Sequence, residues 1–244
     1  MMIKAYSLLI ILFLPFVIQA QQTTAWIEQL EYLQSGDEEL QIENRLRTYL
    51  DYDFSSLLVP RTKVLGFIGE HYQRIHINFN SVVKDPVFKN IYQVSGTTVV
   101  RGNSCDFKGQ IVVEQVREFN NLQYGVDDSY TGDEIKAQGI LIGRFFFAEN
   151  PEQSHVGIFS GIMTTWWCLD SSEQLQYNDL GMIADGYGNN QYVGSWMEYG
   201  KLEEKVCNWG EYRIPFSGDL DVGAAEFYVN PDYYDRGWEA FDRH

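Results

Sequence analysis

Gln138–Ala148 (QGILIGRFFFA) and His155–Leu169 (HVGIFSGIMTTWWCL) are the two stretches that decide the fold of this chain. Each carries apolar residues on both alternating faces, a pattern typical of β-strands that are covered on both sides. The residues between them include Glu149-Asn150-Pro151-Glu152, which is a turn sequence. Because strands joined by a short turn are usually neighbours, we expect these two to pair antiparallel.

Glycines recur at a fixed spacing inside these two strands. Gly139 and Gly143 are four residues apart, and so are Gly157 and Gly161. Side chains alternate along a strand, so each pair lies on a single face. Glycines inside strands mark bends and close packing, and two neighbouring strands that bend predict a sheet that curls and closes. The alternative is a chance spacing in a chain with 21 glycines.

The rest of the chain after Pro60 also has β character. Tyr72–Ser81 alternates cleanly, with Ile75, Ile77 and Phe79 on one face. Further strands are predicted at Ile91–Val100, Gly109–Phe119, Gln191–Tyr199, Glu211–Ile214 and Val222–Val229. About nine strands with short turns and no alternation with helices predict a mainly β protein, an antiparallel meander that forms a barrel. A two-sheet β-sandwich is the alternative.

The only helical pattern comes before this region. Apolar residues recur at helical spacing in two runs, Trp26, Ile27, Leu30 and Leu33, then Leu40, Ile42, Leu46 and Leu50. Gly36 and Asp37 separate the runs, and Asp37 can cap the second helix. We therefore expect a helical segment over residues 21–56, followed by one barrel-like domain over residues 57–244.

The first twenty residues have the pattern of a secretory signal peptide. Met1–Ala20 combines Lys4, an apolar run over Leu8–Ile18 and the small residue Ala20. This run is shorter than the roughly 20 apolar residues of a spanning helix. We expect export and removal of residues 1–20, with an uncleaved membrane anchor as the alternative.

The chain is strongly acidic. It carries 34 Asp and Glu against 18 Lys and Arg, a net charge of −16. Loss of Lys4 with the leader leaves 34 against 17, a net charge of −17. Nucleic acids and anionic membranes bind clustered cations, so both are disfavoured as partners. Cationic or neutral ligands fit this charge, and solubility alone is the alternative explanation.

Three cysteines lie in an exported chain, where disulfides can form. Cys105 and Cys207 have polar, turn-like surroundings, whereas Cys168 lies in an apolar run where a thiol usually behaves as a small buried hydrophobe. We expect one disulfide, between Cys105 and Cys207. Three free thiols are the alternative, because sequence does not determine connectivity.

Two acidic loops are candidate calcium sites, the only cofactor that the sequence suggests. One is GVDDSYTGDE, with carboxylates at Asp127, Asp128, Asp133 and Glu134. The other has Asp219 and Asp221 in a fragment of a calcium loop. Calcium takes six to eight oxygen ligands, which such loops can supply. Solvated acidic loops are the alternative in a chain of this charge.

Tryptophans are the candidate ligand-binding residues, namely Trp166, Trp167, Trp196 and Trp209. The adjacent Trp166 and Trp167 must face opposite sides of their strand, so one of them can line a lumen or an outer groove. Aromatic platforms suit sugars and apolar ligands. Ordinary core packing is the alternative. The sequence has no nucleophile elbow, P-loop, zinc helix or paired-cysteine motif, so it offers no catalytic residues.

Several motifs carry a resemblance to a known family. They are Gly66-Phe67-Ile68-Gly69 with Tyr72-Gln73-Arg74-Ile75, Gly125-Val126-Asp127-Asp128, Gln138-Gly139-Ile140-Leu141, Cys207-Asn208-Trp209-Gly210 with Tyr212-Arg213-Ile214-Pro215, and Ser217-Gly218-Asp219-Leu220-Asp221. Over Leu57 to Trp238 the chain resembles a family of secreted proteins of Gram-negative gut-type bacteria with no assigned activity. The resemblance implies a periplasmic location and supplies no catalytic residues. Gly194-Ser195-Trp196 is also similar to the Gly-x-Trp of lipocalins, an architectural likeness.

Three functions are compatible with these features. The leading hypothesis is a secreted, periplasmic, non-enzymatic protein that binds a small ligand or another envelope protein. The second is a hydrolase that cleaves glycans with a pair of carboxylates. The third is an inhibitor or immunity-type protein whose acidic surface binds a basic partner.

Overall fold

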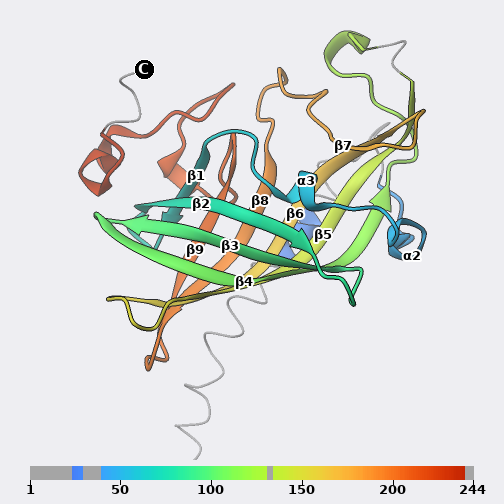
Figure 1. Cartoon of the computed structure of the whole chain (residues 1–244). Helices are drawn as coiled ribbons and strands as arrows, with labels where there is room; N and C mark the ends of the chain where they lie inside the picture. The colour runs from blue at the N-terminus through green and yellow to red at the C-terminus, as the bar shows by residue number, and fades with distance from the viewer. Residues whose placement is uncertain (1–23, 30–39, 131–133, 240–244) are drawn as a thin grey trace, which may run out of the picture.

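The computed structural model describes residues 24–29, 40–130 and 134–239. These residues form a mainly β structure with few helices (Figure 1). The strands are β1 Val64–Ile68, β2 Gln73–Lys84, β3 Ile91–Val100, β4 Asn103–Glu118, β5 Ile135–Glu149, β6 Gly157–Asp170, β7 Leu175–Tyr177, β8 Asn189–Glu198 and β9 Glu204–Glu211. Residues 24–29 are helical, and the other helical elements are α2 Leu46–Tyr49, α3 Ser55–Leu58, η1 Val126–Asp128, η2 Gly218–Leu220 and η3 Pro231–Arg236. None of the helices in these ranges is long and apolar enough to cross a membrane.

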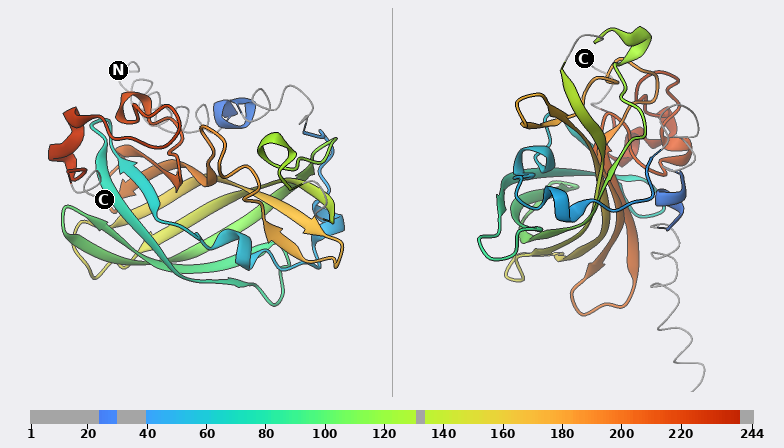
Figure 2. Two further views of the ribbon diagram at one scale, coloured as in Figure 1. Left: turned by 90° about the horizontal axis from the view of Figure 1, so that it is seen from above. Right: turned by 90° about the vertical axis from the view of Figure 1, so that its right-hand side faces the viewer.

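Eight strands close into an antiparallel barrel, which confirms the predicted fold class (Figure 1; Figure 2). Around the barrel the order is β5-β4-β3-β2-β1-β9-β8-β6, and β5 pairs with β6 to complete the ring. Most neighbours in the ring follow one another along the chain, and the pairing of β1 with β9 joins the first strand to the last. The short β7 pairs with the far end of β6 and stays outside the ring. A two-sheet sandwich is excluded, because its sheets would have open edges.

The glycines predicted to bend β5 and β6 lie on the inner face of the barrel. They do not oppose each other, because Gly143 pairs with Met163 and Gly161 pairs with Phe145. On its other side Gly161 pairs with Gly194 of β8. The Phe145 ring lies across these two glycines, so the missing side chains make room for a large ring inside a small barrel.

The centre of the barrel is filled, and one of its ends is plugged. Trp167, Trp209 and Tyr192 are fully buried in the centre. The α2–α3 segment closes one end of the barrel, where Leu57 of α3 is also fully buried. We call this the plugged end; it carries the β2–β3 turn, at the right of Figure 1. The opposite end, where the β3–β4, β5–β6 and β8–β9 turns lie, has no such cover among the described residues.

Two segments cover parts of the outer surface. Leu65 and Phe67 of β1 point outward and pack against the segment that follows β9, including Trp238. On another side Trp26, from helical residues 24–29, packs against outward-facing residues of β5 that include Ile140. These covers explain why strands of a barrel are apolar on both faces.

Some strand predictions are wrong at the C-terminal side. Residues 222–229 do not form a strand, because only one isolated bridge, Asp221 to Val229, joins their ends. Their apolar residues instead cover β1, as Phe227 does. The predicted strand at Glu211–Ile214 begins where β9 ends. The sequence pattern did not predict β1, β7 or most of β9. In β1 the outward residues Leu65 and Phe67 are apolar because a segment covers them, which hides the alternation. The strand β7 is only three residues long.

The second predicted helix is also mostly wrong. Only Leu46–Tyr49 is helical, while Leu40 forms a bridge with Phe119 just beyond β4. Gln41 N donates to the carbonyl of Glu118, so the backbone follows the end of β4 rather than a helix. Ile42 is 93% exposed, which removes the apolar face that the helical spacing suggested. Leu30, Leu33, Gly36 and Asp37 lie outside the described residues.

The predicted disulfide is absent, because Cys105, Cys168 and Cys207 are all free thiols. Cys105 lies in β4 and Cys207 in β9, which are four strands apart in either direction around a ring of eight. They are therefore on opposite walls of the barrel. A disulfide needs Cα atoms within about 7 Å, which opposite walls cannot provide. Both residues lie buried in strands, not in the turn-like settings that favoured a bridge.

Candidate binding site at the open end of the barrel

The open end of the barrel contains a cavity of about 830 Å³, which we call the mouth cavity. Its walls are the strand ends at this end of the barrel, and they include Val100 of β3, Phe159 of β6 and Trp196 of β8. Cavities of roughly 300–1,000 Å³ with mostly apolar walls and a few polar groups are typical of small-molecule sites. The mouth cavity has this size and combines apolar and polar lining groups.

Glu149 is the buried charged group of the mouth cavity. It is the last residue of β5, and its side chain is on the same face as Phe145 and Phe147, which point into the barrel. The residue is 4% exposed and lines the cavity. Its position before Asn150-Pro151 predicted a turn residue, whereas Glu149 belongs to β5 and the alternation along that strand places it on the inner face.

Three neutral groups hold the Glu149 carboxylate. Oε1 accepts a hydrogen bond from Thr98 Oγ1 at 2.5 Å. Oε2 accepts from Gly157 N at 2.9 Å and from Trp196 Nε1 at 2.9 Å. A backbone N–H and an indole N–H are donors only, so both stabilise the ionised carboxylate. Glu149 thus joins β3, β6 and β8 at the inner wall of the cavity.

Charged side chains surround the cavity entrance. Glu198 pairs with Lys201 at 2.5 Å, and this hydrogen bond lowers the pKa of Glu198 below its ordinary value. Glu204 accepts from Ser195 Oγ at 2.9 Å. Lys205 places its Nζ 5.2 Å from the centre of the Trp196 ring. The entrance is therefore polar and already accommodates an ammonium group beside an aromatic face.

Of the four predicted ligand-binding tryptophans, Trp196 lines the mouth cavity. The other three predicted residues, Trp166, Trp167 and Trp209, do not line this cavity. Trp167 and Trp209 belong to the packed centre of the barrel. Trp166 lies on the outer face, where its Nε1 donates to the carbonyl of Gly188 at 3.0 Å. The prediction that Trp166 and Trp167 face opposite sides is confirmed.

The residues predicted to bind calcium are not brought together with other ligands. Asp127 and Asp128 are exposed in η1, and Asp133 lies outside the described residues. Asp221 pairs with Arg213 at 2.5 Å, and Asp219 is an acceptor at the surface. Within the described ranges no cluster of three or more His, Cys, Asp or Glu could hold a metal ion. Calcium binding stays a prediction.

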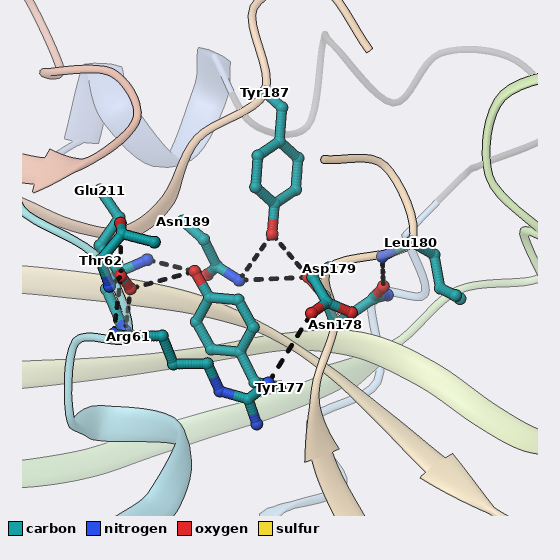
Figure 3. Close-up of polar contacts among 10 residues, drawn as sticks. Arg61, Thr62, Tyr177, Asn178, Asp179, Leu180, Tyr187, Asn189 and Glu211 are labelled. Carbon is teal, nitrogen blue, oxygen red and sulfur yellow. Dashed lines mark hydrogen bonds and ion pairs between the residues drawn. The ribbon is translucent and has the colours of Figure 1, made fainter. Parts of the chain in front are cut away.

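A second buried carboxylate, Glu211, lies toward the plugged end (Figure 3). Its Oε1 accepts from Arg61 N at 2.7 Å, from Thr62 N at 2.5 Å and from Thr62 Oγ1 at 2.9 Å. Its Oε2 accepts from Tyr177 OH at 3.0 Å and Asn190 Nδ2 at 2.7 Å. A carboxylate has about four acceptor positions, so five donors saturate it. Glu211 therefore has no capacity left for a ligand.

The Glu211 network extends outward through β7. Figure 3 shows the Tyr187 hydroxyl pointing at the carbonyl of Asn178 and at Asn189. Arg61 lies over the Tyr177 ring, with its guanidinium carbon 4.5 Å from the ring centre. Burial raises the pKa of Tyr177 far above its ordinary value, with further increases from Tyr187 and Glu211, so Tyr177 stays a donor at any physiological pH. These contacts tie the segment before β1 to β7, β8 and β9.

The free thiols give a testable consequence. Burial raises the pKa of Cys168 to about 11, and burial with the nearby charge of Glu149 raises the pKa of Cys105 and of Cys207. A thiolate is the reactive form, so at pH 8 we expect Cys168 in the folded protein to react with iodoacetamide roughly a hundredfold more slowly than in the unfolded chain. Mass spectrometry of the alkylated chain measures this.

The unfolded chain is the control for that experiment. Without reductant it should gain three alkyl groups, because no disulfide holds back a thiol. A gain of one group in the unfolded, unreduced chain would show that a disulfide exists and would contradict the structure.

Comparisons with protein-family models, with curated proteins and with solved structures found no match to this chain. What the mouth cavity can bind therefore follows from its own residues alone. A mouth cavity with one buried carboxylate, an indole and apolar walls can hold a small molecule that presents both an apolar part and a hydrogen-bond donor.

Proposed function

We propose that this chain is an exported, non-enzymatic binding protein that takes up a small, partly apolar molecule through the open end of its barrel. The observation that carries the proposal is the mouth cavity of about 830 Å³ in a barrel whose centre and other end are filled. Closely packed proteins retain few voids larger than a water molecule, so a cavity of this size at one end of the barrel needs an explanation. A ligand site provides it.

The lining of the cavity supports binding in preference to hydrolysis. A glycosidase needs two carboxylates that face each other across the substrate. Glu149 is the buried glutamate of the lining, whereas Glu198 and Glu204 are engaged at the entrance by Lys201 and Ser195. The other two glutamates of the lining, Glu70 and Glu203, are exposed. This leaves one carboxylate at the inner wall, beside Trp196, an arrangement suited to orienting a bound molecule.

The leader sequence supports export. Met1–Ala20 has the charged, apolar and small-residue parts of a signal peptide, and the chain resembles secreted proteins of Gram-negative gut-type bacteria. We infer that the barrel works in the periplasm. Mass spectrometry of protein expressed with its natural leader should find a chain that begins at Gln21, and recovery of intact Met1 from membranes would contradict export.

Binding can be tested with N-phenyl-1-naphthylamine, a weakly basic, uncharged probe whose fluorescence increases in apolar sites. We expect saturable binding, weakened at least about tenfold by Val100→Trp, because the indole would occupy part of the mouth cavity where Val100 lies. Val83→Trp is the matched control, since Val83 is 57% exposed on the outside of β2 and should leave binding unchanged. A fluorescence titration measures both.

Two results would overturn the proposal. One is the absence of saturable probe binding to the folded protein. The other is equal binding by the Val100→Trp variant, which would place the probe elsewhere. Thermal unfolding of both variants checks that each is folded before the titration.

A further inference from the structure

No cation among the described residues balances the charge of Glu149. Its three partners, Thr98, Gly157 and Trp196, are all neutral donors. Among the described residues no lysine, arginine or histidine forms an ion pair with it. A buried carboxylate without a counter-charge is costly, and neutral donors offset only part of that cost.

The Glu149 carboxylate also retains acceptor capacity. It receives three hydrogen bonds, against about four that a carboxylate can accept, and Oε1 receives only the one from Thr98. Glu211, with five donors, shows what a saturated buried carboxylate looks like in the same barrel. Glu149 lines the mouth cavity, whereas Glu211 does not.

The surroundings of the cavity favour a positive charge. Its lining includes five glutamates against three lysines and arginines, in a chain with a net charge of −16. Burial and the charge of Glu149 both raise the pKa of Cys105 and of Tyr199. These shifts agree with a negative potential at the inner wall, which attracts cations.

The aromatic residues of the mouth cavity are also compatible with a positively charged ligand. The Lys205 ammonium lies 5.2 Å from the centre of the Trp196 ring, which is within the range of a cation–π contact. Phe159 lies beside Trp196, with ring centres 6.4 Å apart, and both line the cavity. An ammonium group near Glu149 would therefore have aromatic neighbours for the apolar part of its molecule.

We propose that the ligand of the mouth cavity is an organic amine, whose protonated nitrogen donates to Glu149 and whose apolar part packs against Trp196 and Phe159. This inference rests on the proposed binding function and names its ligand class. Aliphatic amines, like the lysine side chain, are protonated at pH 7. A charged donor forms a stronger hydrogen bond to a carboxylate than a neutral one does.

Competition for the fluorescent probe tests the ligand class. Three competitors share one skeleton and differ in charge: 4-phenylbutylamine, 4-phenylbutanol and 4-phenylbutyrate. At pH 7 we expect the amine to displace N-phenyl-1-naphthylamine at a concentration at least about tenfold lower than the alcohol, and the carboxylate to be the weakest. In Glu149→Gln the amine should lose its advantage and match the alcohol within about twofold.

The Glu149→Gln variant should fold, because its amide can keep the oxygen toward Gly157 and Trp196 and donate its NH₂ to the Thr98 hydroxyl. Glu152→Gln is the matched control, since it removes the same charge from the exposed β5–β6 turn. It should retain the preference for the amine, and a probe titration of each variant confirms that the cavity is intact.

Lys205→Gln also tests the ligand class, and it should strengthen amine binding where Glu149→Gln weakens it. Loss of the Lys205 ammonium removes a like charge beside Trp196, so displacement by the amine should become several-fold stronger while displacement by the alcohol stays unchanged. Equal displacement by amine and alcohol in the native protein, or an amine preference that survives Glu149→Gln, would overturn the ligand class. In either case probe binding would persist, so the proposed binding function would stand separately.

Discussion

Replacement of Gly161 by alanine should destabilise the protein by about 3 kcal/mol, whereas Gly143→Ala should cost less than about 1 kcal/mol. A Cβ on Gly161 would collide with the backbone carbonyl oxygen of Val193 and come within 2.6 Å of Gly194 Cα and 2.9 Å of Phe145 Cε1. Backbone atoms of a paired strand cannot move aside without breaking the barrel wall. Urea unfolding followed by tryptophan fluorescence gives both free energies.

Gly143 is the matched control for this effect. A Cβ there would lie 3.1 Å from Ile111 Cγ2 and from the carbonyl oxygen of Val112, so shifts of a few tenths of an ångström relieve the contact. Asp128→Ala, in the exposed η1, should change the free energy of unfolding by no more than about 0.5 kcal/mol. Equal stability of the Gly161 and Gly143 variants would contradict the close approach of β6 and β8.

Replacement of Glu211 by alanine should reduce the free energy of unfolding by about 4 kcal/mol. The carboxylate accepts hydrogen bonds from four residues, Arg61, Thr62, Tyr177 and Asn190. Without it the Tyr177 hydroxyl and the Asn190 amide stay buried and lose this partner, whereas Arg61 and Thr62 are exposed and can bond to water. Each buried unpaired donor costs roughly 1–3 kcal/mol. Urea unfolding of the variant measures the loss.

An exposed glutamate provides the control for the Glu211 experiment. Glu203, in the exposed turn between β8 and β9, has the same charge, and Glu203→Ala should cost less than about 0.5 kcal/mol. Probe binding at the mouth cavity by folded Glu211→Ala should persist, because Glu211 does not line that cavity. A loss below 1 kcal/mol would mean that the network of Figure 3 contributes little to stability.

Local patterns in the sequence determined the fold class. Ile75 and Ile77 alternate with polar residues, and the structure places both inside the barrel. Short turns joined successive strands and so predicted a meander, because strands joined in this way usually pair with each other. Gly161 indicated a place where the strand is closely packed, since only a residue without a side chain fits beneath the Phe145 ring. The signal peptide and the calcium loops stay predictions.

Tertiary structure decided the candidate site. Cys105 and Cys207 looked like a pair until closure placed them on opposite walls. Glu149 ends an apolar strand at a turn, and only the arrival of Thr98 and Trp196 from distant strands makes it a buried carboxylate. Alternation is a local property that the backbone imposes every two residues, whereas burial, charge balance and the open end depend on contacts between segments that are far apart in the chain.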